Sequence, residues 1–179
     1  MIILGIDPGT TSIGYGVVEK RKNCLYVVDF GCINASPKIF NEISIKTESF
    51  NYLPLQLRKI YDEVTSLIER YHPKELACEK LFMYKNVKTA MSVGQSRGVI
   101  ILAGVNAGID VSEYTPLQVK QSVVGYGRAT KNQVQQMVKM LLNMKEIPRP
   151  DDAADALAVA ICHINSAGLS KLIASHNHP

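Results

Sequence analysis

The fold is decided by residues 2–33, which read IILGIDPGTTSIGYGVVEKRKNCLYVVDFGCI. Three runs in this stretch are rich in Val, Ile, Leu, Tyr and Phe: residues 2–6, 14–19 and 25–33. Runs of this composition favour strands. Turn-forming sequences, first Pro-Gly and then Lys-Arg-Lys-Asn, separate them. The stretch therefore predicts three consecutive antiparallel strands.

Helices and strands alternate in the rest of the chain. Apolar residues recur at helical spacing over residues 53–70, and His-Pro ends that pattern. The remaining expected elements are strands at 76–79 and 111–114 and helices at 86–107, from Pro116, at 131–144 and at 151–166. Strands of both orientations with alternating helices predict an α/β fold, a mixed five-stranded sheet with helices on both faces.

The length and composition indicate one soluble domain. The chain has 179 residues, of which 46% are hydrophobic and 20% charged, as in ordinary globular proteins. We expect residues 1–166 to form this domain and residues 167–179 a flexible C-terminal tail. No apolar run approaches the ~20 residues needed to span a bilayer. The first residues lack the positive region of a secretion signal, and the four cysteines are dispersed, so we expect a cytoplasmic protein without membrane contact.

Positive charge is concentrated in the middle of the chain. Residues 80–140 contain eight Lys or Arg residues and two acidic ones, a net charge of +6, whereas the whole chain carries +4. The remainder is therefore negative, at −2. A basic section beside carboxylates suits a polyanionic substrate such as nucleic acid. A solvated helical face would explain the same charges, and composition alone does not separate the two explanations.

Four acids that are distant in sequence occur in similar contexts. Asp7 and Glu79 each end a short apolar run, and Asp152 and Asp155 lie at i, i+3 near the start of an expected helix. Carboxylates at strand ends and on one helix face can converge on divalent cations, because Mg²⁺ prefers oxygen ligands. The set predicts a two-metal centre for phosphodiester chemistry, with Asp7 as the bridging ligand.

Each acid also has a simpler explanation. Asp-Pro-Gly is a common turn, so Asp7 alone is weak evidence. Acids in a first helical turn favour the helix dipole, which accounts for Asp152 better than for Asp155. Glu79 is harder to explain this way, because a glutamate that ends a buried strand needs a cation or another partner.

Small residues recur along the helix expected at 86–107. Ala90, Gly94 and Gly98 are spaced every fourth residue and make a groove that another backbone could approach. Each helical glycine costs ~1 kcal/mol relative to alanine, so a packing reason is expected. The groove could accept this chain's own sheet or a second copy of the chain.

Five motifs resemble those of the RuvC Holliday-junction resolvases. They occur in family order and span the chain from Met1 to about Ile164: Asp7-Pro-Gly, Glu79-Lys-Leu-Phe82, Gly94-Gln-Ser-Arg97-Gly98, Lys120-Gln-Ser-Val-Val-Gly125 and Asp152-Ala-Ala-Asp155-Ala-Leu-Ala. The resemblance implies an RNase H-like fold. It also implies a homodimer that resolves four-way DNA junctions in recombination and repair by two symmetric cuts, leaving 5′-phosphate and 3′-hydroxyl ends.

The resemblance also implies cofactors, partners and residue roles. It implies two Mg²⁺ per site, with Mn²⁺ as a substitute, and a RuvAB-type branch-migration complex as partner. The matched catalytic and metal-binding acids are Asp7, Glu79, Asp152 and Asp155. The matched DNA-binding residues are Phe82, Lys85, Lys120 and Lys131, although Phe82 could also pack in the core and the lysines could be surface charges. The segment at residues 34–52, between the third strand and the first long helix, is longer than in the family pattern. Its extra length predicts an inserted hairpin or flap.

Three other functions fit parts of the sequence. A related RNase H-like nuclease could act on another DNA structure or on an RNA–DNA hybrid. The Asp-Pro-Gly-Thr-Thr turn resembles a phosphate-binding turn of actin-like ATPases and kinases, but those proteins need two such subdomains, for which the chain is too short. A non-catalytic junction-binding protein would gain nothing from acids near DNA. The sequence therefore favours a metal-dependent junction endonuclease.

Overall fold

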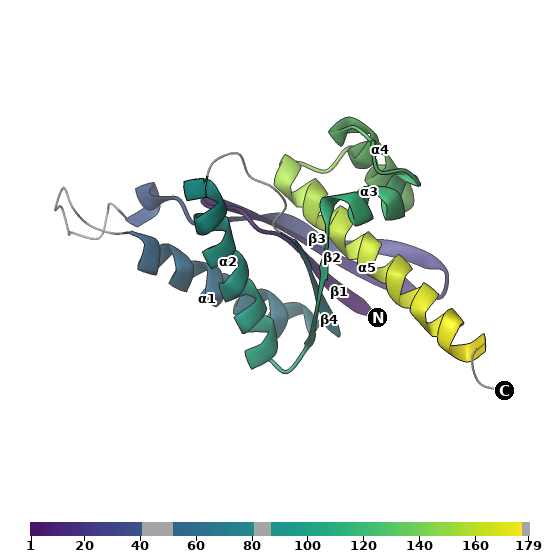
Figure 1. Ribbon diagram of the computed structural model, residues 1–179, viewed down its shortest axis with the longest axis horizontal. Helices are drawn as coiled ribbons and strands as arrows, with labels where there is room; N and C mark the ends of the chain where they lie inside the picture. Colours follow the sequence, from purple (N-terminus) through teal and green to yellow (C-terminus); the bar gives the residue numbers. More distant parts are fainter. Residues whose placement is uncertain (41–51, 81–86, 177–179) are drawn as a thin grey trace.

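A five-stranded mixed sheet forms the centre of the computed structural model, which describes residues 1–40, 52–80 and 87–176 (Figure 1). The sheet order is β3-β2-β1-β4-β5. The first three strands, β1 (Ile2–Asp7), β2 (Ser12–Arg21) and β3 (Cys24–Asn34), form the predicted antiparallel meander. The other two, β4 (Glu75–Glu79) and β5 (Asp110–Tyr114), run parallel to β1.

Helices cover both faces of the sheet, as the sequence predicts. One face carries α1 (Leu53–Tyr71) and α2 (Val87–Asn106), and the other carries α3 (Pro116–Val124), α4 (Lys131–Leu141) and α5 (Asp151–His176) (Figure 1). A short 3₁₀ helix, η1 (Pro37–Phe40), follows β3. Each face has its own apolar cluster, one beneath α1 and α2 and the other beneath α3, α4 and α5. None of the described helices is long and apolar enough to cross a membrane.

The close approach of α5 to the sheet depends on glycines in the strands. A Cβ added at Gly5 in β1 would overlap the carbonyl oxygen of Ala156, and one added at Gly14 in β2 would overlap that of Asp152. The small side chains of Ala153, Ala156 and Ala160 complete this contact from the helix side, since all three are fully buried. The first turns of α5 therefore rest on the main chain of β1 and β2.

The helix α5 is longer than predicted. The sequence predicts its end at Ser166, but the helix continues through Gly168 to His176. One glycine inside a helix costs only ~1 kcal/mol and does not end it. Residues 167–176 are thus helical, and residues 177–179 lie outside the described part. Most of the predicted insertion at 34–52 also lies outside it, so that insertion stays a prediction.

Candidate active site

Two parallel strands and one helix bring the four predicted acids to one edge of the sheet. Asp7 is the last residue of β1, and Glu79 is the last residue of β4. Because β1 and β4 are parallel neighbours, their carboxyl ends meet at the same edge. Asp152 and Asp155 come from the first turns of α5, which lie on the adjoining strands.

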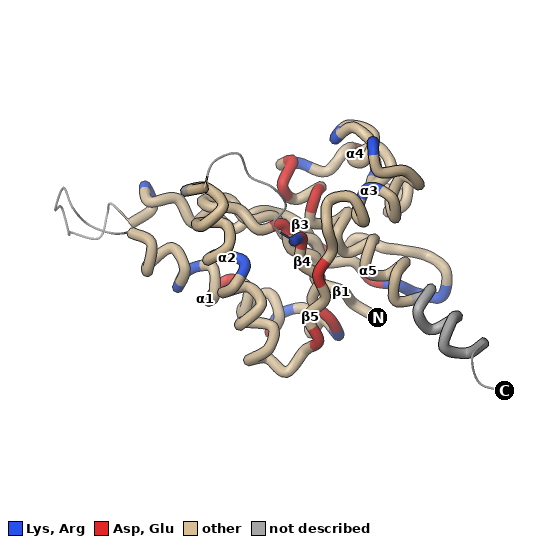
Figure 2. Tube along the Cα trace, in the orientation of Figure 1, with Lys and Arg blue, Asp and Glu red and all other residues tan. Residues whose placement is uncertain are grey.

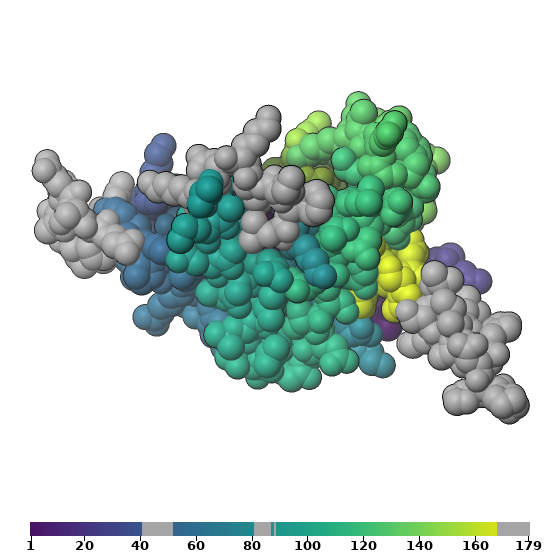
Figure 3. All heavy atoms as spheres, viewed as in Figure 1, coloured from purple at the N-terminus to yellow at the C-terminus, as the bar shows by residue number. Residues whose placement is uncertain are grey.

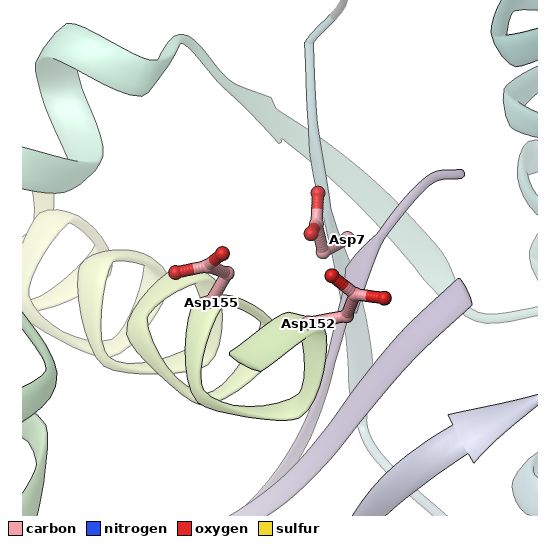
Figure 4. Close-up of side chains that lie close together, drawn as sticks. All are labelled: Asp7, Asp152 and Asp155. Atoms are coloured by element: carbon pink, nitrogen blue, oxygen red, sulfur yellow. The ribbon is translucent and has the colours of Figure 1, made fainter. Parts of the chain in front are cut away.

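Three of these acids form a tight group. Oxygens of Asp7, Asp152 and Asp155 all lie within 4.8 Å of one another. Figure 4 shows the two α5 carboxylates beside the carboxylate of Asp7 at the end of β1. Glu79 is not part of this group, but its charge is close enough to raise the pKa of Asp7. The structure thus places Glu79 next to the three aspartates rather than among them.

Burial and mutual repulsion raise the pKa values of these acids. Burial, followed by the charges of Glu79 and Asp155, raises the pKa of Asp7 to about 8. Burial and Asp155 raise the pKa of Glu79 to about 7. Partly buried carboxylates that repel one another fit a bound cation, because a cation would offset both effects. The atoms that could coordinate a metal ion here are all carboxylate oxygens, which suit a hard cation such as Mg²⁺.

Two predicted lysines lie beside the acids. The Nζ atom of Lys131, the first residue of α4, lies 3.0 Å from Oδ2 of Asp155 and 3.4 Å from Oδ2 of Asp151. The positive charge of Lys120 in α3 offsets part of the rise in the pKa of Glu79 that burial and Asp155 cause. Both lysines line a pocket of about 240 Å³ together with Glu79 and Asp155. Along the chain trace in Figure 2, acidic positions (red) lie at the start of α5 and basic positions (blue) on α3 and α4.

One neighbour of the acids was not predicted. Ser12, at the start of β2, donates a hydrogen bond from its Oγ atom to Oδ2 of Asp152, at 2.7 Å. The sequence signal that could have identified Ser12 is its position in β2, because every second residue of a strand faces the same side and Ser12 therefore shares a face with Gly14 and Gly16. The two other predicted DNA-binding residues, Phe82 and Lys85, lie outside the described residues.

A family match decides what this site belongs to. The family model described as crossover junction endodeoxyribonuclease RuvC matches residues 3–163. The chain belongs to the RuvC family. It is similar to RuvC of Halothermothrix orenii, with 52% identity over 171 residues that cover 96% of each chain. It is also similar to RuvC of Desulfitobacterium hafniense, with 50% identity over 169 residues, 94% of this chain and 95% of the relative.

Solved structures agree with this membership. Thermus thermophilus RuvC in complex with Holliday junction substrate superimposes with a TM-score of 0.84 at 33% identity, over 95% of this chain and 96% of that one. The yeast mitochondrial Holliday junction resolvase Ydc2 has a TM-score of 0.62 at 17% identity, over 94% of this chain and 81% of that one, and shows the shared fold alone. The RNase H-like fold is confirmed. As a RuvC-family member, the chain is an endodeoxyribonuclease that depends on metal.

Proposed function

We propose that this RuvC-family nuclease resolves Holliday junctions by hydrolysing two symmetric phosphodiester bonds, one at each active site of a homodimer. The observation that carries the proposal is the convergence of Asp7, Asp152 and Asp155 beside Lys131. Four-way junction DNA is supported as the substrate by the similarity to T. thermophilus RuvC, whose structure contains a Holliday junction. No observation favours an RNA–DNA hybrid or another DNA structure.

The acids would hold two Mg²⁺ ions, with Mn²⁺ as a substitute. Asp7, Asp152 and Asp155 fit one shared group of ligands, and Glu79 extends the carboxylate set along the edge of the sheet. Bound in pairs, such ions supply Lewis-acid stabilisation to the attacking and leaving oxygens of an in-line displacement. Asp7 suits a shared ligand, because the charges of all three other acids act on its carboxyl group.

The lysines would serve the DNA strand. Lys120 in α3 and Lys131 in α4 line the pocket together with Glu79 and Asp155. Lys131 forms an ion pair with Asp155 and is half exposed, so it can exchange this partner for a phosphate oxygen. Phe82 and Lys85 stay in the proposal as DNA contacts because they match the family motif.

The proposed homodimer has a candidate surface on α2. Four large apolar residues on this helix are exposed: Val87, Met91, Leu102 and Val105. Their spacings place them on one face together with Gly98. A Cβ at Gly98 would meet nothing within 4 Å, so this glycine does not pack on the chain's own sheet. Figure 3 shows α2 at the surface of the molecule. A twofold dimer through this face would suit a junction with two equivalent cuts.

Family membership alone supports the remaining parts of the proposal. We expect a cytoplasmic enzyme that works with a RuvAB-type branch-migration complex. None of the described residues carries an independent argument for that partner.

Cleavage of a labelled four-way junction in Mg²⁺ tests the proposal, with wild type beside Asp7→Asn. We expect paired symmetric nicks from wild type only, and unchanged junction binding by the variant, because phosphate contacts supply much of DNA affinity. Linear duplex of the same arms and an RNA–DNA hybrid are the control substrates. Equal cutting of either control, or cleavage retained in Asp7→Asn, would contradict the proposal.

A further inference from the structure

One face of β2 is shaped to receive the start of α5. Ser12, Gly14 and Gly16 alternate along the strand and therefore point toward the same side of the sheet. A Cβ at Gly14 would overlap the Asp152 carbonyl group, and one at Gly16 would press on Leu157. Ser12 is the residue of this row that keeps a side chain, and its hydroxyl group reaches the Asp152 carboxylate at 2.7 Å.

The direction of this hydrogen bond follows from its chemistry. An ionised carboxylate has acceptors only, so the hydroxyl group of Ser12 must donate. A charge-assisted hydrogen bond of this kind limits rotation of the carboxylate. The hydrogen bond occupies Oδ2 of Asp152, and no described side chain donates to Oδ1.

The acids of the site differ in the partners that hold them. Asp155 forms an ion pair with the ammonium group of Lys131, and the positive charge of Lys120 acts on Glu79. Asp152 is instead held by a neutral group. A metal ion that binds such a carboxylate would weaken its ion pair with a lysine, because the two positive charges repel each other. A serine can keep its hydrogen bond throughout.

We infer that Ser12 is a positioning residue for Asp152, whose hydrogen bond pre-orients this carboxylate and sets the affinity of the site for divalent cations. The inference rests on the proposed function, because it concerns the metal site of the same nuclease. Hydrogen bonds to metal-ligating carboxylates typically change metal affinity or activity by about 10- to 100-fold when removed.

Mn²⁺ binding to the free protein, measured by titration calorimetry, tests the inference directly. We expect Ser12→Ala to bind Mn²⁺ about tenfold more weakly than wild type. Ser12→Thr keeps the hydroxyl group and should restore the affinity. Ser36→Ala is the matched control, since Ser36 lies in the turn after β3, where its hydroxyl accepts from the backbone N–H of Lys38. The control should bind Mn²⁺ as wild type does.

A merely structural role for Ser12 would give a different result. If the hydrogen bond only fixes α5 to β2, Ser12→Ala should melt at a lower temperature in EDTA and keep wild-type affinity for Mn²⁺. Unchanged affinity, or a threonine variant as weak as the alanine variant, would overturn the inference. Junction cleavage by wild type separates the two claims: Mn²⁺ binding without cleavage would overturn the proposed function and leave the role of Ser12 standing.

Discussion

At the scale of single residues, the acids of the site respond to pH in a direction set by their burial. Burial and neighbouring charges raise the pKa values of Asp7 and Glu79, to about 8 and about 7. Without a cation, the folded protein therefore keeps protons that the unfolded chain releases. The tighter proton binding of the folded protein contributes to its free energy of unfolding. This contribution is complete below about pH 4 and is lost as the pH rises through 7 and 8.

We expect the free energy of unfolding in EDTA to fall between about pH 6 and about pH 8.5. The fall should be smaller for Asp7→Asn, because asparagine does not ionise. Mg²⁺ at the higher pH should restore stability to wild type, since the cation binds the ionised carboxylates. Urea unfolding at both pH values measures these effects. An equal fall in wild type and variant would show that Asp7 does not titrate in this range.

Lys131 provides a second test at the residue scale. Lys131→Gln removes the cation beside Asp155, and we expect cleavage to fall about 100-fold, as when one charge-stabilising donor is removed from an active site. Junction binding should change little, because one phosphate contact is a small part of the total. Lys139→Gln, on the same helix, is the matched control for single-turnover cleavage. A similar loss in both variants would indicate a general charge effect.

At the scale of elements, the contact between β2 and α5 makes a specific demand on Gly14. In Gly14→Ala the new Cβ would overlap the Asp152 carbonyl group, so the first turn of α5 must move. We expect a loss of about 2 kcal/mol in the free energy of unfolding, as for other overpacked sites. Cleavage should fall as well, because Asp152 moves with the helix.

The matched control for Gly14→Ala is Gly98→Ala on α2, where the added Cβ would have nothing within 4 Å. This change should leave stability unchanged or raise it by up to about 1 kcal/mol, since alanine is the better helix former. Unfolding should be measured at protein concentrations too low for association. If both variants have wild-type stability, the contact between α5 and β2 is looser than the structure indicates.

The elements themselves could be predicted from the sequence because their periodicities are strong. The apolar patterns of strands and helices predicted the mixed sheet. Asp7 and Glu79 were predicted as site residues because each ends an apolar strand. The lysines could not be placed from periodicity, because nothing local in α3 or α4 shows that they pack beside the start of α5. They were found only through the family resemblance. Ser12 carries no motif, and its role depends on a contact between residues 140 positions apart.

At the scale of the whole molecule, the exposed face of α2 predicts how two copies associate. Leu102 is 50% exposed, so Leu102→Lys should leave the chain folded. In the proposed dimer the same change buries a charge, and we expect the dissociation constant to rise at least about 100-fold. Paired nicks at a junction should then give way to single ones. Sedimentation velocity and junction cleavage measure the two effects.

Met140→Lys is the matched control for this prediction. Met140 is 71% exposed on α4, outside the α2 face, so its replacement should leave both association and paired cleavage unchanged. A Leu102→Lys protein that remains dimeric would place the interface elsewhere.

The main-chain contact between α5 and the sheet has a consequence for how this enzyme tolerates change. The acids Asp7, Asp152 and Asp155 are carried by β1 and α5, and α5 meets β1 and β2 through main-chain atoms together with the small or close-packed side chains of Ala156, Leu157 and Ala160. Substitutions in the apolar cluster beneath α1 and α2, on the opposite face of the sheet from α5, can therefore lower the melting temperature while the molecules that stay folded keep the spacing of the acids. Loss of stability and loss of chemistry are therefore separable on that face of the sheet, and they are coupled where α5 meets the glycines of β1 and β2.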